Sequence, residues 1–280
     1  MNSKAADFYV YDGTPLDKAF ARTTHLAVSA HQDDIEFMAF RGILECFGKK
    51  DKWFSAIVMT DGAGSPRSGL YADYTDAEMQ AVRQVEQKKA AFVGEYGSLT
   101  LLNYPSRQVK DPDDEDSVAD LVELLKKMQP EVVYTHNPAD KHDTHVGAMT
   151  KVIKAIRRLP KEIRPKQVYG CEVWRGLDWV CNFQKIRLDV GEHPNLAAAL
   201  MGVFDSQIAG GKRYDAATIG RRTANATYAD DHEVDRAEQV SYAIDLTPLI
   251  EDDSLDLVEY IISYIDNFAS EVKARITKVN

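Results

Sequence analysis

The order of its apolar segments constrains the fold of this chain more than any other feature. Between residues 25 and 159, short apolar runs typical of buried strands alternate with longer segments whose apolar residues recur every three or four positions. The expected strands cover residues 25–30, 53–60, 99–103 and 131–136, and the expected helices cover residues 34–48, 76–94, 117–129 and 145–159. This alternation predicts an α/β fold, with a mostly parallel sheet covered by helices on both faces.

The pattern weakens after about residue 165. Residues 166–176 are typical of one further strand, residues 195–211 of a helix and residues 252–276 of an amphipathic terminal helix, whereas residues 221–230 have no clear period. We therefore predict a single domain over residues 1–280. Its Rossmann-like core covers about 23–160, and a C-terminal part of about 161–280 adds some strand and the terminal helix and completes the pocket.

Composition excludes several classes of partner. The net charge of −10 disfavours a nucleic-acid or anionic-membrane surface, because both select for clustered Lys and Arg. The N-terminus has no apolar core of a signal peptide, and no stretch approaches the roughly 20 apolar residues of a membrane span. Three cysteines imply no disulfide framework. We expect a cytoplasmic protein with a small-molecule substrate, and a homo-oligomer stays open.

The first chemistry-bearing cluster is "HQDD", which ends the first expected strand. It places His31, Asp33 and Asp34 at the edge of the core. Charge in such a place is unfavourable unless it is paired or bound to a metal. Two adjacent aspartates point in divergent directions, so that one can bind a metal while the other faces a water molecule.

The second cluster, residues 135–147, follows another expected strand. It holds three of the seven histidines, His136, His142 and His145, together with Asp140 and Asp143. Both clusters fall at the carboxyl ends of strands, where open α/β sheets bind ligands. Catalytic zinc takes three imidazole or carboxylate ligands and a water. Each cluster alone is equally well explained by capping or hydrogen bonding, but together they favour a metal site of two histidines and one aspartate, with a carboxylate left over as base.

Four segments carry a resemblance to a known family. "AHQDDIEF" resembles the AHPDDxE signature of the PIG-L/LmbE-like zinc-dependent N-deacetylases, and "HNPADKHDTHVGA" resembles the family's second block, which ends in H-P-D-H. "TDGAGSPR" and "VRQVEQKKAAFVG" are similar to its T-x-G segment and its R-x-x-E helix. The resemblance covers roughly residues 25–160, and it is specific in combination rather than piece by piece.

The resemblance implies roles by position. His31, Asp34 and His145 match the metal ligands, Asp33 matches the general base, and His142 matches the histidine that assists the tetrahedral intermediate. The implied cofactor is one Zn²⁺ per chain, although another divalent ion could bind the same donors.

Substrate-binding residues are also expected. Arg83 matches the helix arginine, with an ion pair to Glu86 as the equally favoured alternative. The loop after residue 60 is expected at the rim of the pocket, with an exposed flexible loop as the alternative. The predicted substrate-binding residues are Arg83, Asp61, Ser65, Arg67, Asp140 and Gln207.

The implied function is a zinc hydrolase that releases acetate from an N-acetylated amino sugar or glycoconjugate. The chain departs from the family pattern at Gln32, where the signature has Pro, and at Thr144, where the second block has Asp. Two alternatives stay open. One is a metal-dependent hydrolase of another bond, such as a phosphoester. The other is a catalytically silent carbohydrate-binding relative, for which Thr144 is the one hint.

Overall fold

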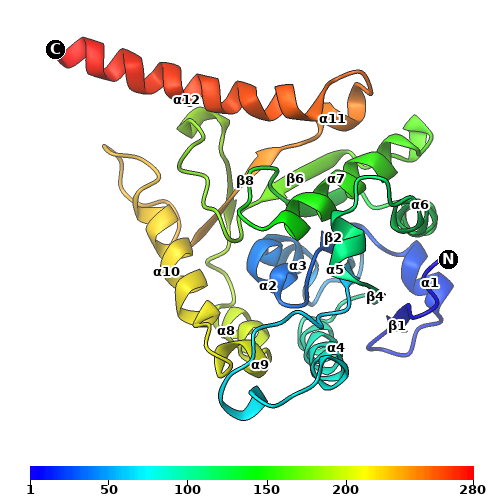
Figure 1. Ribbon diagram of the computed structural model, residues 1–280. Coiled ribbons are helices and arrows are strands. Elements are labelled where there is room, and N and C mark those ends of the chain that lie inside the picture. The colour runs from blue at the N-terminus through cyan, green and yellow to red at the C-terminus, as the bar shows by residue number, and fades with distance from the viewer.

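A single sheet of eight strands forms the centre of the molecule in the computed structural model, which describes residues 1–280 (Figure 1). The strands are β1 (Asp7–Tyr9), β2 (His25–Ser29), β3 (Phe54–Thr60), β4 (Ser98–Tyr104), β5 (Val132–His136), β6 (Gln167–Cys171), β7 (Ile186–Asp189) and β8 (Val240–Asp245). Their order is β1-β4-β3-β2-β5-β6-β8-β7. The five central strands are parallel and the three outer ones antiparallel, which confirms the predicted mostly parallel α/β sheet.

Helices cover both faces of this sheet. They are α1 (Leu16–Ala21), α2 (Asp34–Met38), α3 (Phe40–Cys46), α4 (Asp76–Val93), α5 (Ser106–Lys110), α6 (Asp116–Met128), α7 (Asp143–Arg157), α8 (Pro194–Gly202), α9 (Asp205–Ile208), α10 (Tyr214–Thr227), α11 (Pro248–Glu251) and α12 (Leu257–Val279). One apolar core joins the sheet to α1, α5, α6 and α7, and a second core joins the opposite face to α2, α3, α4 and α8 (Figure 1).

Most expected elements agree closely with the structure. The four expected strands and the helices at 76–94 and 117–129 lie within one residue of the observed bounds. The expected helix over 34–48 is instead two helices, because the backbone turns at Ala39 (φ −111°, ψ 20°) between α2 and α3. The expected helix over 195–211 is likewise divided into α8 and α9.

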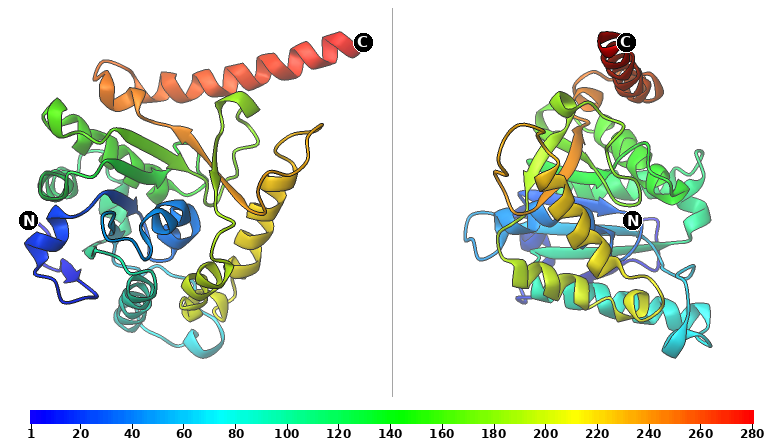
Figure 2. Two further views of the ribbon diagram at one scale, coloured as in Figure 1. Left: turned by 180° about the vertical axis from the view of Figure 1, so that it is seen from behind. Right: turned by 90° about the vertical axis from the view of Figure 1, so that its left-hand side faces the viewer.

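Helix α10 was missed in the aperiodic stretch 221–230. The reason is visible in its packing: its two buried residues are Arg222 and Ala226, so no apolar stripe marks its inner face. The strands β7 and β8 were also not located, although some strand was expected in the C-terminal part. These strands extend the same sheet as the N-terminal core, and α10 lies beside α8 and β8 (Figures 1 and 2).

Helix α4 is built to present polar groups inward. Thr75 and Glu78 form a reciprocal capping box at its start, which satisfies two backbone N–H groups. Arg83, Glu86 and Gln87 are buried at three- and four-residue spacing on one helix face. Buried polar side chains need partners: Arg83 and Gln87 find them in the loop that follows β2, whereas Glu86 pairs with Arg83 and with Ser206.

The terminal helix α12 runs along the edge of the molecule, and its C-terminal end extends past the rest of the fold (Figure 2). None of the helices is both long enough and apolar enough to span a bilayer.

Candidate metal and active site

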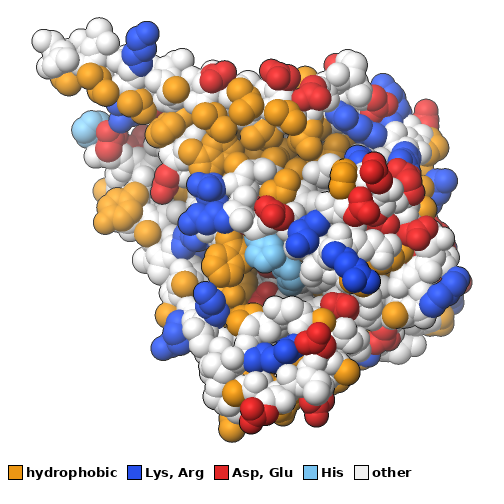
Figure 3. All heavy atoms as spheres, in the orientation of Figure 1, with side chains coloured by type: hydrophobic (Ala, Val, Ile, Leu, Met, Phe, Trp, Pro, Cys, Tyr) orange, Lys and Arg blue, Asp and Glu red, His pale blue; other side chains and the backbone are white.

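A cavity of about 500 Å³ opens where the carboxyl ends of β2, β3 and β5 meet. Loops that follow these strands form one wall, and α10 with residues 172–174 forms the other. Figure 3 shows the mouth as a hollow in which histidine side chains are visible between charged and apolar groups. The cavity therefore lies at the edge of the sheet where both histidine clusters were expected, and the C-terminal part completes it.

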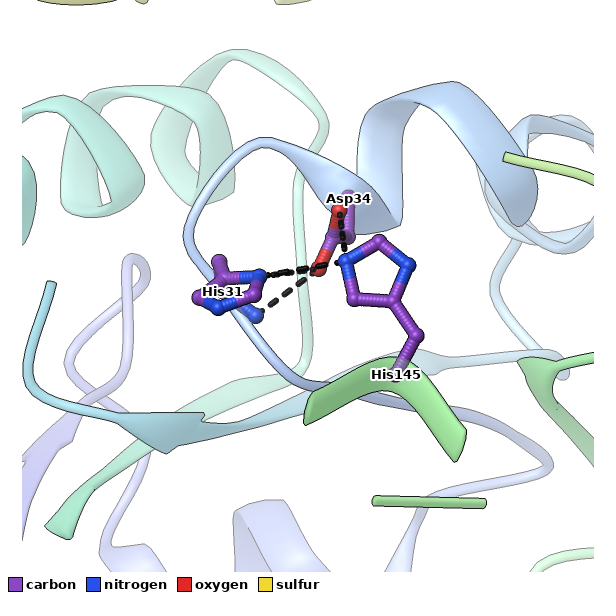
Figure 4. A group of neighbouring side chains, drawn as sticks. All are labelled: His31, Asp34 and His145. Atoms are coloured by element: carbon purple, nitrogen blue, oxygen red, sulfur yellow. Dashed lines mark hydrogen bonds and ion pairs between the residues drawn. The ribbon is translucent and has the colours of Figure 1, made fainter. Parts of the chain in front are cut away.

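His31, Asp34 and His145 converge at this edge (Figure 4). His31 Nδ1 and His145 Nε2 are 3.1 Å apart, and each lies 3.4 Å from an oxygen of the Asp34 carboxylate. The backbone N–H of His31 also donates to Asp34 Oδ2 at 2.8 Å, which fixes the carboxylate. Two imidazole nitrogens and a carboxylate oxygen facing one point are the donor set of a catalytic zinc site, so these residues fit a divalent metal.

Two further groups hold His145 in place. Asp140 Oδ1 lies 3.3 Å from the second ring nitrogen of His145, an arrangement that orients metal-binding histidines. The His136 ring stacks on His145 with centroids 4.0 Å apart. The backbone N–H of Ala30 donates to His136 Nε2, so that nitrogen already has its lone pair engaged. His136 is thus a buried support rather than a ligand.

These groups set the charge of Asp34. Burial alone would raise the pKa of its carboxyl, but the neighbouring His145, His136 and His31 rings outweigh that effect and lower it. Asp34 is therefore an ionised acceptor aimed at two histidines.

Asp33 has a different environment from its neighbour. Its backbone is in the left-handed region (φ 86°), which is rare for a non-glycine residue. Gln87 Oε1 accepts from the Asp33 N–H at 3.1 Å, and Arg83 Nη2 lies 3.0 Å from Asp33 Oδ2. Burial raises the pKa of Asp33 to about 7, and Arg83 opposes part of that rise. Asp33 lines the cavity.

The Arg83 guanidinium links the two halves of the chain. It also pairs with Glu86 at 3.0 Å and donates to the Gln32 carbonyl. Glu86 in turn accepts from the backbone N–H and the hydroxyl of Ser206, both at 2.7 Å. The ion pair weighed as an alternative for Arg83 and Glu86 is therefore present. It is buried, and it connects α4 to α9.

Gln32, one of the two departures from the family pattern, braces the loop after β2. Its side chain is fully buried and its Nε2 donates to the Thr60 carbonyl at 3.0 Å. Gly62 lies directly against it: a Cβ there would come within 2.7 Å of Gln32 Oε1, and φ is +76°. A glutamine thus ties the site to the end of β3 where the family has proline.

His142 caps α7 and faces the histidine pair. Its Nδ1 accepts from the Thr144 backbone N–H at 3.3 Å, which leaves Nε2 as the N–H nitrogen of a neutral ring. Its ring centroid is 4.8 Å from those of both His31 and His145. Burial, followed by the charges of His31 and His145, lowers the pKa of His142. Because the backbone of Thr144 makes this contact, the second departure leaves His142 oriented.

The six residues predicted to bind substrate separate into two groups. Ser65, Arg83 and Gln207 line the cavity. Asp61, Arg67 and Asp140 do not: Asp61 accepts from the Ala63 N–H and Gln80, and Arg67 pairs with Asp76 at 2.5 Å.

Asp140 was predicted to bind substrate, but its place in the structure does not fit that role. Its side chain is fully buried behind His145, and it accepts from the backbone N–H groups of His142 and Trp174. A substrate cannot reach it. Sequence position suggested that it occupies the place of a substrate contact, but the turn before α7 folds it inward.

Several cavity residues lie outside the predicted site. Glu172, Trp174, Tyr214 and Arg222 line the wall opposite the metal-site residues. Arg222 is 1% exposed, and its Nε and Nη1 have no hydrogen-bond partner; Glu172 Oε2 has none either. Arg222 and Tyr214 belong to α10, whose inner face carries no apolar stripe, so no periodicity singled them out.

The fold recurs in solved structures at low identity. N,N'-diacetylchitobiose deacetylase from Pyrococcus horikoshii superposes with a TM-score of 0.64 at 16% identity, over 85% of this chain and 90% of that one. The hydratase GalB from Pseudomonas putida KT2440, which acts on 4-carboxy-2-hydroxymuconate, gives 0.61 at 18% identity, over 80% and 95%. The A40926 pseudoaglycone deacetylase Dbv21 gives 0.57 at 14% identity, over 80% and 97%. At these identities the likeness shows the fold alone.

No curated protein matches the sequence. A family model does: the PIG-L model, described as GlcNAc-PI de-N-acetylase, matches residues 26–167. That segment is just over half of the chain and holds both histidine clusters together with α4. The chain therefore belongs to the PIG-L family.

Proposed function

We propose that this protein is a zinc-dependent hydrolase that removes the N-acetyl group from an N-acetylated amino sugar or glycoconjugate. The observation that carries the proposal is the contrast between two adjacent aspartates. Asp34 faces two histidines as a ligand, whereas Asp33 is turned out of that set, held by Arg83, and lines the cavity. A metal-dependent amide hydrolase needs both a ligand set and a separate base.

His31, Asp34 and His145 would hold the ion. Bound zinc supplies Lewis-acid polarisation of the amide carbonyl and of water. The task of Asp33 is to accept the proton of the water that attacks the carbonyl carbon. Burial raises the pKa of Asp33, which favours this role because a base is most efficient when its pKa lies near the working pH.

His142 lies beside both histidines of the ligand set, with its ring centroid 4.8 Å from each of theirs. Its Nε2–H is free to donate to the oxygen that becomes negative as the carbonyl carbon becomes tetrahedral, since its Nδ1 is engaged by Thr144. The C–N bond then breaks, and the proton that Asp33 took from water passes to the leaving nitrogen. Acetate and a free amine are the products, so that one water is consumed for each amide broken.

The far wall of the cavity supports a hydroxyl-rich substrate. Arg222 offers two donors and Glu172 one acceptor without partners inside the protein. A hydroxyl group can accept from one and donate to the other, and unpartnered buried polar atoms gain most from such contacts. Trp174 and Tyr214 add aromatic surface on the same wall. Two of the neighbours in fold are deacetylases by name, which agrees with this class of substrate.

A cytoplasmic location stays a prediction. It rests on the small and odd number of cysteines in the sequence, which implies no disulfide framework.

The test is acetate release by zinc-loaded protein from a panel of N-acetylated amino sugars. Asp33→Asn should keep one metal per chain while its rate falls about 10²- to 10⁴-fold, the usual contribution of a general base. Asp17→Asn, on the exposed face of α1, is the matched control and should behave as wild type. Full activity of Asp33→Asn would contradict the assignment of the base.

Inactivity of the wild type towards every amide in the panel would contradict the deacetylase proposal itself. Turnover of a phosphoester would then favour the hydrolase of another bond. Because GalB shares this fold, hydration of an unsaturated acid belongs in the same assay, and its presence would redirect the proposal.

A further inference from the structure

Helix α12 carries an apolar face that its own chain does not cover. It is 23 residues long, yet only Ile261 and Tyr264 are buried. Large aliphatic side chains along it are exposed, from 40% for Ile265 to 85% for Val279. Figure 3 shows apolar side chains gathered along α12 on the face that also holds the cavity mouth. An exposed apolar stripe of this length marks an interaction surface.

The stripe has the spacing of a coiled coil. Its members alternate in steps of four and three: Val258, Ile262, Ile265, Ala269, Val272, Ile276 and Val279. This places Ile262, Ala269 and Ile276 at a positions, and Val258, Ile265, Val272 and Val279 at d positions, over three heptads. All seven residues are exposed. A 3.5-residue repeat of apolar side chains is required where two helices pack along their length, and an isolated helix does not need one.

The stripe is separate from the face that docks α12 on its own body. Ile261 and Tyr264 contact the body, and Tyr260 and Phe268 on the same side are partly covered. The stripe lies about 100° around the helix from that side, given 100° for each residue. The C-terminal half of α12 also extends past the body, as Figure 1 and the left view of Figure 2 show. A second helix can therefore lie along α12 without displacing it.

The charged residues beside the stripe indicate which helix can pack against it and in which direction. Glu259, Asp266 and Lys273 follow one another at seven-residue intervals along one edge of it. The N-terminal part of this edge is thus acidic and its C-terminal end basic, whereas Arg275 lies on the other edge and pairs with Glu271 at 2.8 Å. In two copies that run in opposite directions this edge faces itself, so that Glu259 of each helix lies against Lys273 of the other. In two copies that run in the same direction it faces the other edge, which carries Ile261, Phe268 and Arg275.

We propose that α12 is a dimerisation helix, and that its occupant is α12 of a second copy of this chain, packed antiparallel along the stripe. In that arrangement the overhanging half of each helix covers the body-side half of the other. An anionic membrane surface fits less well, because Glu259 and Asp266 would face the lipid headgroups.

The test is the mass in solution of the full-length protein, measured by light scattering after gel filtration. Wild type should have at least twice the monomer mass of 31.4 kDa. Ile265→Asp/Val272→Asp should halve the wild-type mass without changing its circular dichroism or melting temperature by more than the control does. The control is Val85→Asp/Phe92→Asp, which alters two exposed apolar residues of α4 and should keep the wild-type mass.

Charge reversal tests the direction of packing. Glu259→Lys/Asp266→Lys and Lys273→Glu should each associate less than wild type, because each sets like charges against each other in an antiparallel pair. An equimolar mixture of the two should recover the dimer. A parallel pair would not be weakened by either variant alone, since this edge would then face the apolar side chains of Ile261 and Phe268.

Three results would overturn the proposal. The first is a monomeric wild type, including one that floats with phosphatidylserine-containing vesicles. The second is an assembly whose mass the double Asp variant leaves unchanged. The third is a pair of charge variants that associate as well as wild type. None of these depends on catalysis, because the stripe residues lie outside the cavity lining.

Discussion

The two walls of the cavity differ in how their polar side chains are arranged. On the wall from the N-terminal core, His31, Asp34 and His145 gather their donor atoms within 3.4 Å of one another around one point. On the wall from the C-terminal part, the buried Arg222 and Glu172 keep polar atoms without partners and face no such cluster. The first wall therefore fits an ion, and under the proposed function the second offers its free polar atoms to the substrate.

This difference separates chemistry from recognition. A ligand set must be held at fixed geometry, so its residues sit at strand ends and helix starts and are braced by further residues. A substrate contact must remain open to bind, so it is left unpaired, which destabilises the folded protein and is tolerated at functional sites. The comparison predicts that substitutions on the first wall affect the metal, and that substitutions on the second affect substrate affinity.

The largest effect is expected for Asp34→Ala. It removes the one carboxylate of the ligand set and the acceptor for the His31 backbone N–H. We expect stoichiometric metal binding to be lost and the rate to fall by at least about a thousandfold, because the ion contributes several kcal/mol and each 1.36 kcal/mol is tenfold. Metal analysis after dialysis, together with acetate release, checks this. A variant that keeps one tightly bound ion would show that the ligands lie elsewhere.

A smaller effect on the same wall is expected for Asp140→Asn. The neutral amide is a weaker partner for His145, and such supporting groups contribute about 10- to 100-fold to metal affinity. Competition with a fluorescent zinc chelator measures the loss. Asp143→Asn is the control, because Asp143 belongs to the same cluster in sequence but is exposed. Equal affinities for the two variants would mean that Asp140 does not support the ligand set.

The first wall could be predicted from the sequence to a large extent. Its residues follow strands with clear apolar runs, and the carboxyl ends of adjacent parallel strands meet at one edge. His31, Asp33 and Asp34 were therefore placed together with His142 and His145, and the structure brings all five to one edge of the sheet. Asp140 was misassigned because spacing along the chain does not say which way a turn residue points. His136 lay in the predicted cluster without a role, since stacking is not visible in a sequence.

The second wall could not be located from apolar periodicity, for a physical reason. Its residues come from α10 and from the segment after β6, which reach the cavity only through tertiary packing. Helix α10 buries an arginine where an ordinary helix buries leucine, so the signal that locates helices is absent. The link from Arg83 through Glu86 to Ser206 joins residues more than a hundred positions apart, and no local pattern indicates it.

Arg222→Met gives the smallest expected effect and tests the second wall directly. It removes the unpartnered donors while keeping most of the apolar volume that packs on Phe40. A hydrogen bond to a charged group contributes about 1.5 kcal/mol or more, so kcat/KM for an N-acetylated sugar should fall roughly tenfold, mainly through KM.

Arg222 also donates to the carbonyls of Glu36 and Phe37, so the melting temperature should fall as well. The ratio of kcat/KM for the sugar to that for N-acetylcyclohexylamine, which has no hydroxyl groups, cancels this general loss. That ratio should drop in Arg222→Met and remain at the wild-type value in Arg213→Met, at the exposed start of α10. An unchanged ratio in both variants would mean that Arg222, on the second wall, does not bind the hydroxyl groups of the substrate.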